Sequence, residues 1–251
     1  MQTRIPHSPY AWLTLLLVSL LTTACAGTQT RETDPERDPW EGFNRKVHRF
    51  NMELDKAVAR PLARVYSTVT PKPVQRGLSN FFRNIDYPVT FINQLLQGKF
   101  KESGVSTGRF LVNSTIGLLG FFDVATRMGM LNYDEDFGQT LARWGYEESR
   151  YLVLPFFGPS TFRDGIGQTV YGYAHPVSYV AREDHFYTPL VLDLIQTRAA
   201  FLSQDNALGE AYDPYTLVRD VWLQNREHKI YDGNPPIPDY DSLLDEYDDP
   251  D

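Results

Sequence analysis

The sequence lacks several features that would assign it to a common class of protein. It has one cysteine, Cys25, so no disulfide can form within the chain. Its five histidines are far apart and match no metal-ligand spacing, which argues against a metal site. Its longest apolar run, residues 11–21, is shorter than the about 20 residues that a helix needs to cross a bilayer. We therefore predict no disulfide, no metal, no cofactor and no membrane-spanning helix.

An excess of positive charge is also missing. The formal net charge is −8, from 32 acidic and 24 basic residues, and eight of the acids lie from Asp232 onward, where there is no Lys or Arg. The remaining 24 acids balance the 24 bases, so the body of the chain is nearly neutral. A neutral body without a basic patch argues against nucleic-acid binding. We predict that the acidic, proline-containing segment 232–251 is a disordered tail.

The amino end is arranged as a secretory signal that leads to a cysteine. A short polar start with one cation is followed by the apolar run, and small residues then precede Cys25. This ending resembles the lipobox of bacterial lipoproteins, although Thr22 stands where that signal usually has leucine. We predict a signal peptide over residues 1–24, acylation of Cys25 and a flexible tether over residues 25–37. The alternative is an ordinary signal peptide that happens to contain a cysteine.

The pattern of capping and apolar residues over 38–60 predicts an amphipathic helix. Asp38-Pro39-Trp40-Glu41 offers an N-cap acid, a proline at the first helical position and a capping-box glutamate. Apolar residues then recur at steps of three and four as far as Val58, and the opposite face is mostly basic. We expect this helix to end near Arg60-Pro61. It either covers a core or lies against an anionic membrane or a porin rim.

Proline, glycine and Asp-Pro signals divide the rest of the body, residues 38–231. Residues 70–73 are expected to form a break, which a second helix follows. Asp86 is expected to cap a third helix. Gly98 is expected to end this third helix before a charged link over residues 99–102. Asp213-Pro214 predicts a last long helix. Strand signals are weak except at residues 150–154, which suit half of a hairpin and lead into an apolar turn. The fold class is therefore mainly α, with at most a small β-hairpin.

The segment from Gly108 to Ala125 is apolar on most sides. Its uninterrupted apolar part, residues 116–122, would span about 10 Å as a helix, far less than a bilayer. It is either a buried core helix or a segment that dips into one leaflet. We place seven apolar side chains at the lipid-facing side: Phe110, Leu111, Ile116, Leu118, Leu119, Phe121 and Phe122. Arg109, Asp123 and Arg127 flank them, and either meet lipid headgroups or form local salt bridges.

From Asp38 to about Arg226 the chain resembles the MlaA (VacJ) family of outer-membrane lipoproteins. No single motif is decisive, but the matches occur in order and without large gaps. They are the segments 38–45, 60–61, 77–81, 93–98, 109–117, 120–125, 135–141, 154–164 and 213–215.

This resemblance implies a fold, a location and a function. It implies a ring-like disc of amphipathic helices, partly embedded in the periplasmic leaflet of the outer membrane and held there by its lipid anchor. It further implies non-enzymatic transport: phospholipids misplaced in the outer leaflet pass through a polar channel to a periplasmic carrier protein of the Mla pathway, which maintains lipid asymmetry. A trimeric porin is the implied membrane partner.

Two other functions fit parts of the sequence. The residues Gly104-Val105-Ser106-Thr107-Gly108 match the nucleophile elbow of α/β-hydrolases, with Asp164 and His175 as conceivable partners, which would make a Ser106 lipid esterase. An elbow needs a strand before the serine, and residues 99–103 show no strand pattern. The other alternative is a passive structural lipoprotein of the envelope.

Overall fold

A computed structural model describes residues 35–146, 149–175, 177 and 187–236. The described elements are α2 (Glu41–Leu54), η1 (Asp55–Ala59), α3 (Arg60–Val69), α4 (Lys72–Leu96), α5 (Phe100–Thr115), α6 (Val124–Arg127), α7 (Phe137–Arg143), β1 (Tyr151–Leu154), β2 (Gly158–Thr161), α8 (Phe162–Ala174), α10 (Thr188–Ala200), η2 (Leu202–Gln204), α11 (Asp205–Glu210) and α12 (Pro214–Ile230). The predicted signal peptide, Cys25, most of the tether and the tail beyond residue 236 lie outside the described residues.

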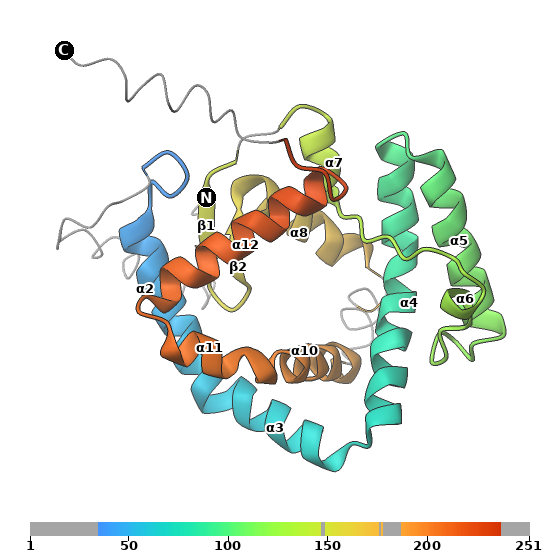
Figure 1. Cartoon of the computed structure of the whole chain (residues 1–251), viewed down its shortest axis with the longest axis horizontal. Helices are drawn as coiled ribbons and strands as arrows, with labels where there is room; N and C mark the ends of the chain where they lie inside the picture. Colours follow the sequence, from blue (N-terminus) through green and yellow to red (C-terminus); the bar gives the residue numbers. More distant parts are fainter. Residues whose placement is uncertain (1–34, 147–148, 176, 178–186, 237–251) are drawn as a thin grey trace, which may run out of the picture.

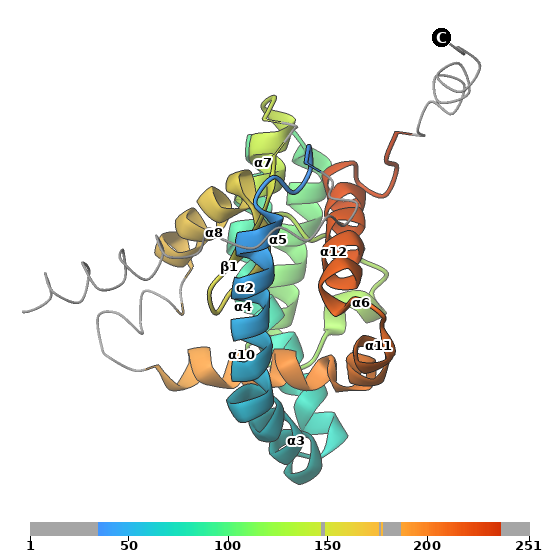
Figure 2. The same cartoon turned by 90° about the vertical axis from the view of Figure 1, so that its left-hand side faces the viewer.

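The helices follow one another around a ring. Figure 1 views the ring face-on, with α4 on one side and α2 opposite, α12 across the top, and α3 along the bottom from α2 to the lower end of α4, with α10 beside it. In the view turned by 90°, α8 and α12 lie on opposite sides of α2 (Figure 2). None of the described helices combines the length and the hydropathy that a membrane crossing requires. The predicted fold class, a ring of helices with one small hairpin, is confirmed.

The first predicted helix differs from the observed one at both ends. Asp38 does not cap it, because α2 starts at Glu41 after Trp40 and has no side-chain cap. The helix also continues through Pro61 as α3. Proline lacks the N–H of a regular helix and its ring clashes with the carbonyl four residues before it. The π-helical segment η1, in which the Arg60 N–H bonds to the Asp55 carbonyl, directly precedes this proline and widens the turn there.

Residues 72–96 form one helix, α4, where two were predicted. Asp86 is not a cap: its carboxylate accepts hydrogen bonds from Tyr171 and, at 2.8 Å, contacts His175. Pro88 lies inside the helix. The predicted break is present but shorter, because α3 ends at Val69 and α4 already starts at Lys72. The end at Gly98 is as predicted, but residues 100–102 belong to α5 and are not a link. Helices α4 and α5 pack side by side along the ring (Figure 1).

Strands β1 and β2 form the predicted hairpin, antiparallel with Tyr151 opposite Thr161. Tyr151 and Val153 point into a small apolar cluster with Val47 of α2 and Tyr215 of α12. Asn44, fully buried on α2, donates to the Tyr151 carbonyl and accepts from the Val153 N–H. The Asn44 side chain therefore satisfies backbone groups at the free edge of β1 that would otherwise pair with a third strand. Asp213 caps α12 through the Tyr215 N–H, as predicted.

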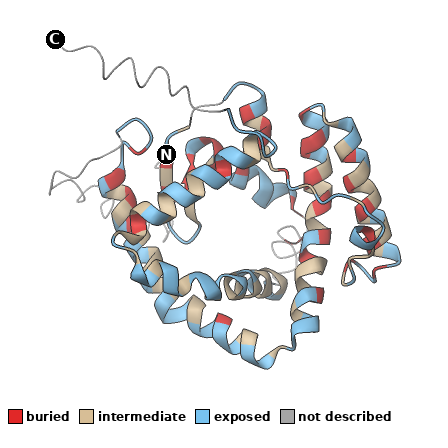
Figure 3. Ribbon diagram, in the orientation of Figure 1, coloured by how far each residue is buried: buried red, intermediate tan, exposed pale blue. Residues whose placement is uncertain are grey.

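Burial in this molecule is inverted relative to an ordinary soluble domain. Among the described residues, buried polar or charged side chains are about twice as numerous as buried hydrophobic ones. Large hydrophobic side chains are exposed on nearly every helix, and Figure 3 shows the buried positions concentrated where α4 meets α5 and α7 meets α8. Water normally drives apolar surface inward, so this distribution requires another apolar phase or a partner to cover the exposed side chains.

Candidate functional site

The most exposed apolar feature of the predicted site is the turn formed by residues 116–122, named here the apolar loop. Helix α5 ends at Thr115 and α6 starts at Val124, so this part of the segment is not a core helix. Leu118 and Leu119 are each 66% exposed, and both have left-handed backbone, with φ of 50° and 59°. Such a conformation costs a residue other than glycine about 1–3 kcal/mol, so the surrounding contacts must hold it in place.

Hydrogen bonds from α4 and α5 provide those contacts. The Gly120 N–H donates to the Asn113 carbonyl at 2.7 Å, and the Asn84 amide donates to the Ser114 hydroxyl and the Leu119 carbonyl. Gly120 has a φ of +92°, and a Cβ there would lie 2.3 Å from the Asn84 side chain. The loop is therefore a fixed structure whose polar backbone groups are satisfied from behind.

A glycine on α4 gives this loop its apolar anchor. The ring of Phe121 lies over Gly77, where an added Cβ would be 2.1 Å from a ring carbon. Asn80, one turn further along α4, donates to the Phe121 carbonyl. Phe121 is therefore half-buried and fastens the loop to the helix, while its neighbour Phe122 is exposed.

Arg109 is buried behind the loop and is completely shielded from solvent. Its guanidinium donates to the Tyr87 hydroxyl at 2.6 Å, to the Met130 carbonyl, and to Asp123 at 3.0 Å. Burial acts to raise the pKa of Asp123, but hydrogen bonds from Thr126 and the charge of Arg109 outweigh it and leave the pKa below its usual value. A fully buried, fully paired arginine cannot reach a headgroup, so the salt-bridge alternative describes Arg109 and Asp123.

The other predicted residues divide into two groups. Four members of the predicted lipid-facing set belong to the apolar loop and are exposed, and Leu111 is exposed on α5, whereas Phe110 and Phe121 are half-buried. Arg127 is exposed at the end of α6. That these side chains contact lipid stays a prediction. The exposed loop residues are Ile116, Leu118, Leu119 and Phe122.

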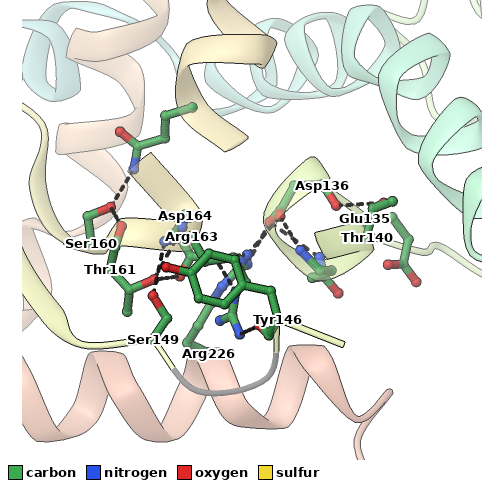
Figure 4. Close-up of polar contacts among 12 residues, drawn as sticks. Glu135, Asp136, Thr140, Tyr146, Ser149, Ser160, Thr161, Arg163, Asp164 and Arg226 are labelled. Atoms are coloured by element: carbon green, nitrogen blue, oxygen red, sulfur yellow. Dashed lines mark hydrogen bonds and ion pairs between the residues drawn. The ribbon is translucent and has the colours of Figure 1, made fainter. Parts of the chain in front are cut away.

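A second buried polar network joins three parts of the ring (Figure 4). Arg226 of α12 donates to both carboxylate oxygens of Asp136, at 2.6 and 2.7 Å, and to Asp164 at the start of α8, at 2.6 Å. The Thr161 hydroxyl donates to Asp164, and the Arg163 guanidinium donates to the Tyr146 carbonyl. One bidentate arginine therefore connects α12 to the start of α7 and to α8 through charge-assisted hydrogen bonds.

This network makes stability depend on pH in the acid range. Burial acts to raise the pKa of Asp136, but its hydrogen bonds from Arg226 and Gln139 lower it from 3.8 to about 2. A lowered pKa in the folded state means that the stabilisation is present above pH 3.8 and is lost as the pH falls toward 2. We expect Asp136→Asn to be less stable at pH 7 but to show a smaller further loss between pH 4 and 2, measured by thermal unfolding. Equal pH slopes in both proteins would contradict this.

The esterase alternative does not fit the structure. Ser106 lies in the middle of α5, and its hydroxyl is fully buried without a hydrogen-bond partner, whereas an elbow serine is exposed between a strand and a helix. Asp164 is engaged by Arg226, and His175 is engaged by Asp86. Neither is therefore paired with Ser106. Among the described residues no group of His, Cys, Asp or Glu is arranged to hold a metal ion.

Sequence reasoning missed the polar residues that hold the site together. Asn84, Asn113 and Arg226 each lie on a helix in a pattern that is also typical of a solvated face. A usable signal was present in the segment 77–84, where Gly77, Asn80 and Asn84 follow at steps of three and four. That spacing places a glycine and two amides on one face of a helix, which suits close packing of a hydrogen-bonded loop.

The fold and the site together define a class: a ring of helices (Figure 1) whose buried side chains are largely polar and which exposes many large apolar side chains. The family model described as MlaA lipoprotein matches residues 36–229 of this chain. The chain belongs to the MlaA lipoprotein family.

Similar proteins and a similar solved structure agree with this membership. An intermembrane phospholipid transport system lipoprotein MlaA from Haemophilus influenzae is 33% identical over 88% of this chain and 90% of its own length. The protein of the same description from Escherichia coli K12 is 35% identical over 86% and 88%. A solved structure, from work on the structural basis for maintenance of bacterial outer membrane lipid asymmetry, is 31% identical with a TM-score of 0.68, and covers 78% of this chain and 99% of its own.

Proposed function

We propose that this chain transports phospholipids between membranes without chemical modification, as an outer-membrane lipoprotein that helps to maintain lipid asymmetry. It takes phospholipids misplaced in the outer leaflet and passes them through the polar interior of the ring toward the periplasm. Relatives that this chain matches over most of their length are described as intermembrane phospholipid transport lipoproteins. This chain carries out the same process, the movement of a phospholipid between membranes.

The observation that carries the proposal is the inverted burial. A phospholipid has a charged headgroup, which is costly to place in hydrocarbon, and acyl chains that are costly to expose to water. A ring with polar buried contacts and many exposed large apolar side chains offers separate environments for the two parts. The apolar loop, held rigidly with Leu118 and Leu119 exposed, supplies a surface for acyl chains.

The finer parts of the proposal concern location and partners. The lipid on Cys25 anchors the ring in the periplasmic leaflet, and the short apolar segments enter that leaflet without crossing it. A trimeric porin lies beside the ring, and a soluble carrier of the Mla pathway receives the phospholipid. The family resemblance supports both partners, and recovery of a porin after detergent extraction and pull-down of the full chain tests the first.

Deletion of the gene is expected to raise the amount of phospholipid in the outer leaflet, measured by labelling with an amine-reactive probe that does not cross membranes. The wild-type chain should restore the low level. The double variant Leu118→Ser/Leu119→Ser should fold but restore it poorly, because the exposed surface of the apolar loop becomes polar.

Ser106→Ala is the matched control, since it tests catalysis while leaving the exposed surface unchanged. It should restore the low level fully. Unchanged outer-leaflet phospholipid after deletion would contradict the transport function and would favour a passive structural lipoprotein. If Ser106→Ala failed to restore the low level of outer-leaflet phospholipid although a normal amount of folded protein was present, that result would support the esterase alternative.

A further inference from the structure

One segment of the ring is held in place without a buried residue of its own. Helices α10 and α11, with the short 3₁₀ helix η2 between them, cover residues 188–210 and are named here the crossbar. Within this described segment no residue of the three elements is buried. Figure 1 shows α10 on the side of α3 that faces the ring interior, with its start toward α4, and α10 packs against both helices. The crossbar therefore borders the interior through which the phospholipid is proposed to pass.

The side chains of α10 do not gather into one buried apolar face. Val191 and Leu194 are exposed, at 49% and 63%, and Asp193, which stands between them in the sequence, is half-buried. A helix is normally fixed to its domain by an apolar stripe that faces the core. Because α10 buries no residue, hydrophobic burial holds it less firmly than it holds α4, whose buried residues include Phe82 and Tyr87.

Four charged side chains fasten the end of the crossbar to the π-helical segment η1 and the start of α3. Arg198 of α10 donates to both carboxylate oxygens of Asp55, at 2.6 and 3.0 Å, and to Asp205 of α11, at 2.7 Å. Arg60 lies 3.2 Å from Asp55 and 3.4 Å from Asp205. These four residues are named here the charge clasp. Its two cations and two carboxylates balance one another.

The charge clasp is sheltered and well aligned, unlike an ordinary surface ion pair. Exposed pairs contribute little to stability, but each of these four side chains is at most 21% exposed, and Arg198 grips Asp55 with two parallel bonds. Burial acts to raise the pKa of Asp55, but the bonds from Arg198 and the charge of Arg60 outweigh it and lower the pKa. Among the described residues, every hydrogen bond or ion pair between the crossbar and another helix or strand involves this clasp.

The segment η1 brings Asp55 and Arg60 to the same side of the helix. Residues five apart in an α-helix lie about 140° apart around the axis. In η1 the Arg60 N–H bonds to the Asp55 carbonyl five residues earlier, and this wider turn lets the Arg60 guanidinium meet the Asp55 carboxylate. The π-helical segment therefore does more than accommodate Pro61, because it forms the fixed half of the clasp.

The start of the crossbar has no such attachment among the described residues. The Asp193 carboxylate accepts a hydrogen bond within its own helix, from Gln196. Burial and the nearby charge of Asp86 on α4 raise the pKa of Asp193, whereas Gln196 and His175 act to lower it. Two carboxylates that face each other repel when both are ionised. The crossbar is thus fastened by opposite charges at its end and meets a like charge at its start.

We propose that the crossbar is the moving part of the ring: it turns on the charge clasp, its start moves away from α4, and this movement admits a phospholipid to the ring interior. Elements that move are those with few buried contacts, and the networks around Arg109 and Arg226 fix other parts of the ring. This inference rests on the proposed function and adds a gate to it. Arg198 is a positioning residue, which acts by holding the pivot of the crossbar.

The test locks the start of the crossbar to α4 in the full-length chain. Asp86→Cys and Asp193→Cys place one thiol on each helix, and a bifunctional thiol reagent with a reducible centre joins them in cells that lack the native gene. Cys25 is the only native cysteine, and it is acylated in the proposed protein, so no other thiol reacts. We expect outer-leaflet phospholipid to stay at the level of the deletion strain while the link is present. After reduction of the link it should fall to the wild-type level.

Two controls show that a block comes from the link. Each single-cysteine variant, treated with the same reagent, should restore the low level of outer-leaflet phospholipid. A photo-crosslinking amino acid at Phe122 of the apolar loop should capture phospholipid equally in the locked and unlocked proteins, because locking leaves that loop in the membrane. Loss of this capture on locking would attribute the block to a displaced ring and would overturn the gate.

The outcomes separate the gate from the proposed function. If the locked chain restored the low level as well as the wild-type chain, or if the singly modified chains failed equally, the crossbar would not be a gate and the transport function would stand. If deletion of the gene left outer-leaflet phospholipid unchanged, the transport function itself would be overturned, and the gate with it.

Hydrogen exchange of the full-length protein in detergent tests the clasp separately. Arg198→Met should speed amide exchange in residues 188–210 at least about tenfold, because charge-assisted bonds to the crossbar are lost, and should leave exchange in α12 unchanged. Arg198→Lys, which keeps the charge without the planar fork, should have a smaller effect. Arg219→Met is the matched control, since Arg219 pairs with Asp38 and Asp220 and not with the crossbar. Wild-type exchange of the crossbar in Arg198→Met would overturn the assignment of the clasp.

Discussion

Replacement of Arg226 by methionine is expected to lower the free energy of unfolding by about 3–5 kcal/mol, because it removes one partner of a buried charge network. Asp164 would stay buried with only the longer contact to Arg163, at 3.3 Å, as an ion pair, and Asp136 would lose a bidentate partner. The contact that joins α12 to α7 and α8 would open. Thermal unfolding in detergent should shift down by roughly 6–20 °C, given the size of the chain.

Two variants make this result specific. Arg226→Lys keeps the charge but not the planar fork, so it should lie between wild type and methionine. Arg127→Met removes an exposed arginine from α6 and should change stability by less than about 0.5 kcal/mol. If Arg226→Met destabilised the protein no more than Arg127→Met, the ring would not depend on this network.

Replacement of Arg109 by methionine is the second large expected effect, again a loss of about 3–5 kcal/mol. The substitution leaves Asp123, the Tyr87 hydroxyl and the Met130 carbonyl without their shared donor. Because these groups hold the ends of the apolar loop, lipid capture from a probe at Phe122 should also fall. Thermal unfolding and crosslinking measure the two effects separately.

A double-mutant cycle identifies the cause. Asp123→Asn removes the carboxylate that Arg109→Met leaves unpaired, so the double variant should be less destabilised than the sum of the two single variants. The shortfall should be at least about 1 kcal/mol for a contact of this kind. Additive losses would mean that the salt bridge is not the interaction that secures the loop.

Much of the secondary structure was readable from local chemistry. The Asp213-Pro214 cap, the end at Gly98, the break after Val69 and the strand at 151–154 each depend on neighbours a few residues away in sequence. Errors arose where a distant partner intervened. Asp38 was expected to cap a helix, but its carboxylate bonds to Asn44 and Tyr215, and Asp86 was expected to do the same but bonds to Tyr171 and His175.

The candidate site shows the same contrast between features that depend on sequence neighbours and features that depend on distant partners. The sequence indicated which segment is apolar, and most of the loop side chains that it selected are exposed. It did not indicate that Ile116 to Phe122 is a turn, because hydropathy is the same for a buried helix and for an exposed loop that is clamped from behind. The sequence also did not decide whether Arg109 meets a lipid headgroup or forms a local salt bridge. That choice depends on how deeply α4 and α5 bury the guanidinium.

The sequence by itself determined the helical class, the hairpin and the family, because periodicity, caps and ordered motifs are local properties of the chain. Only the tertiary structure decided which charges close the ring and which apolar side chains are left outside it. The physical reason is that a buried ion pair such as Arg226 with Asp164 is stable only when distant segments bring the partners together and exclude water. No local pattern records that arrangement.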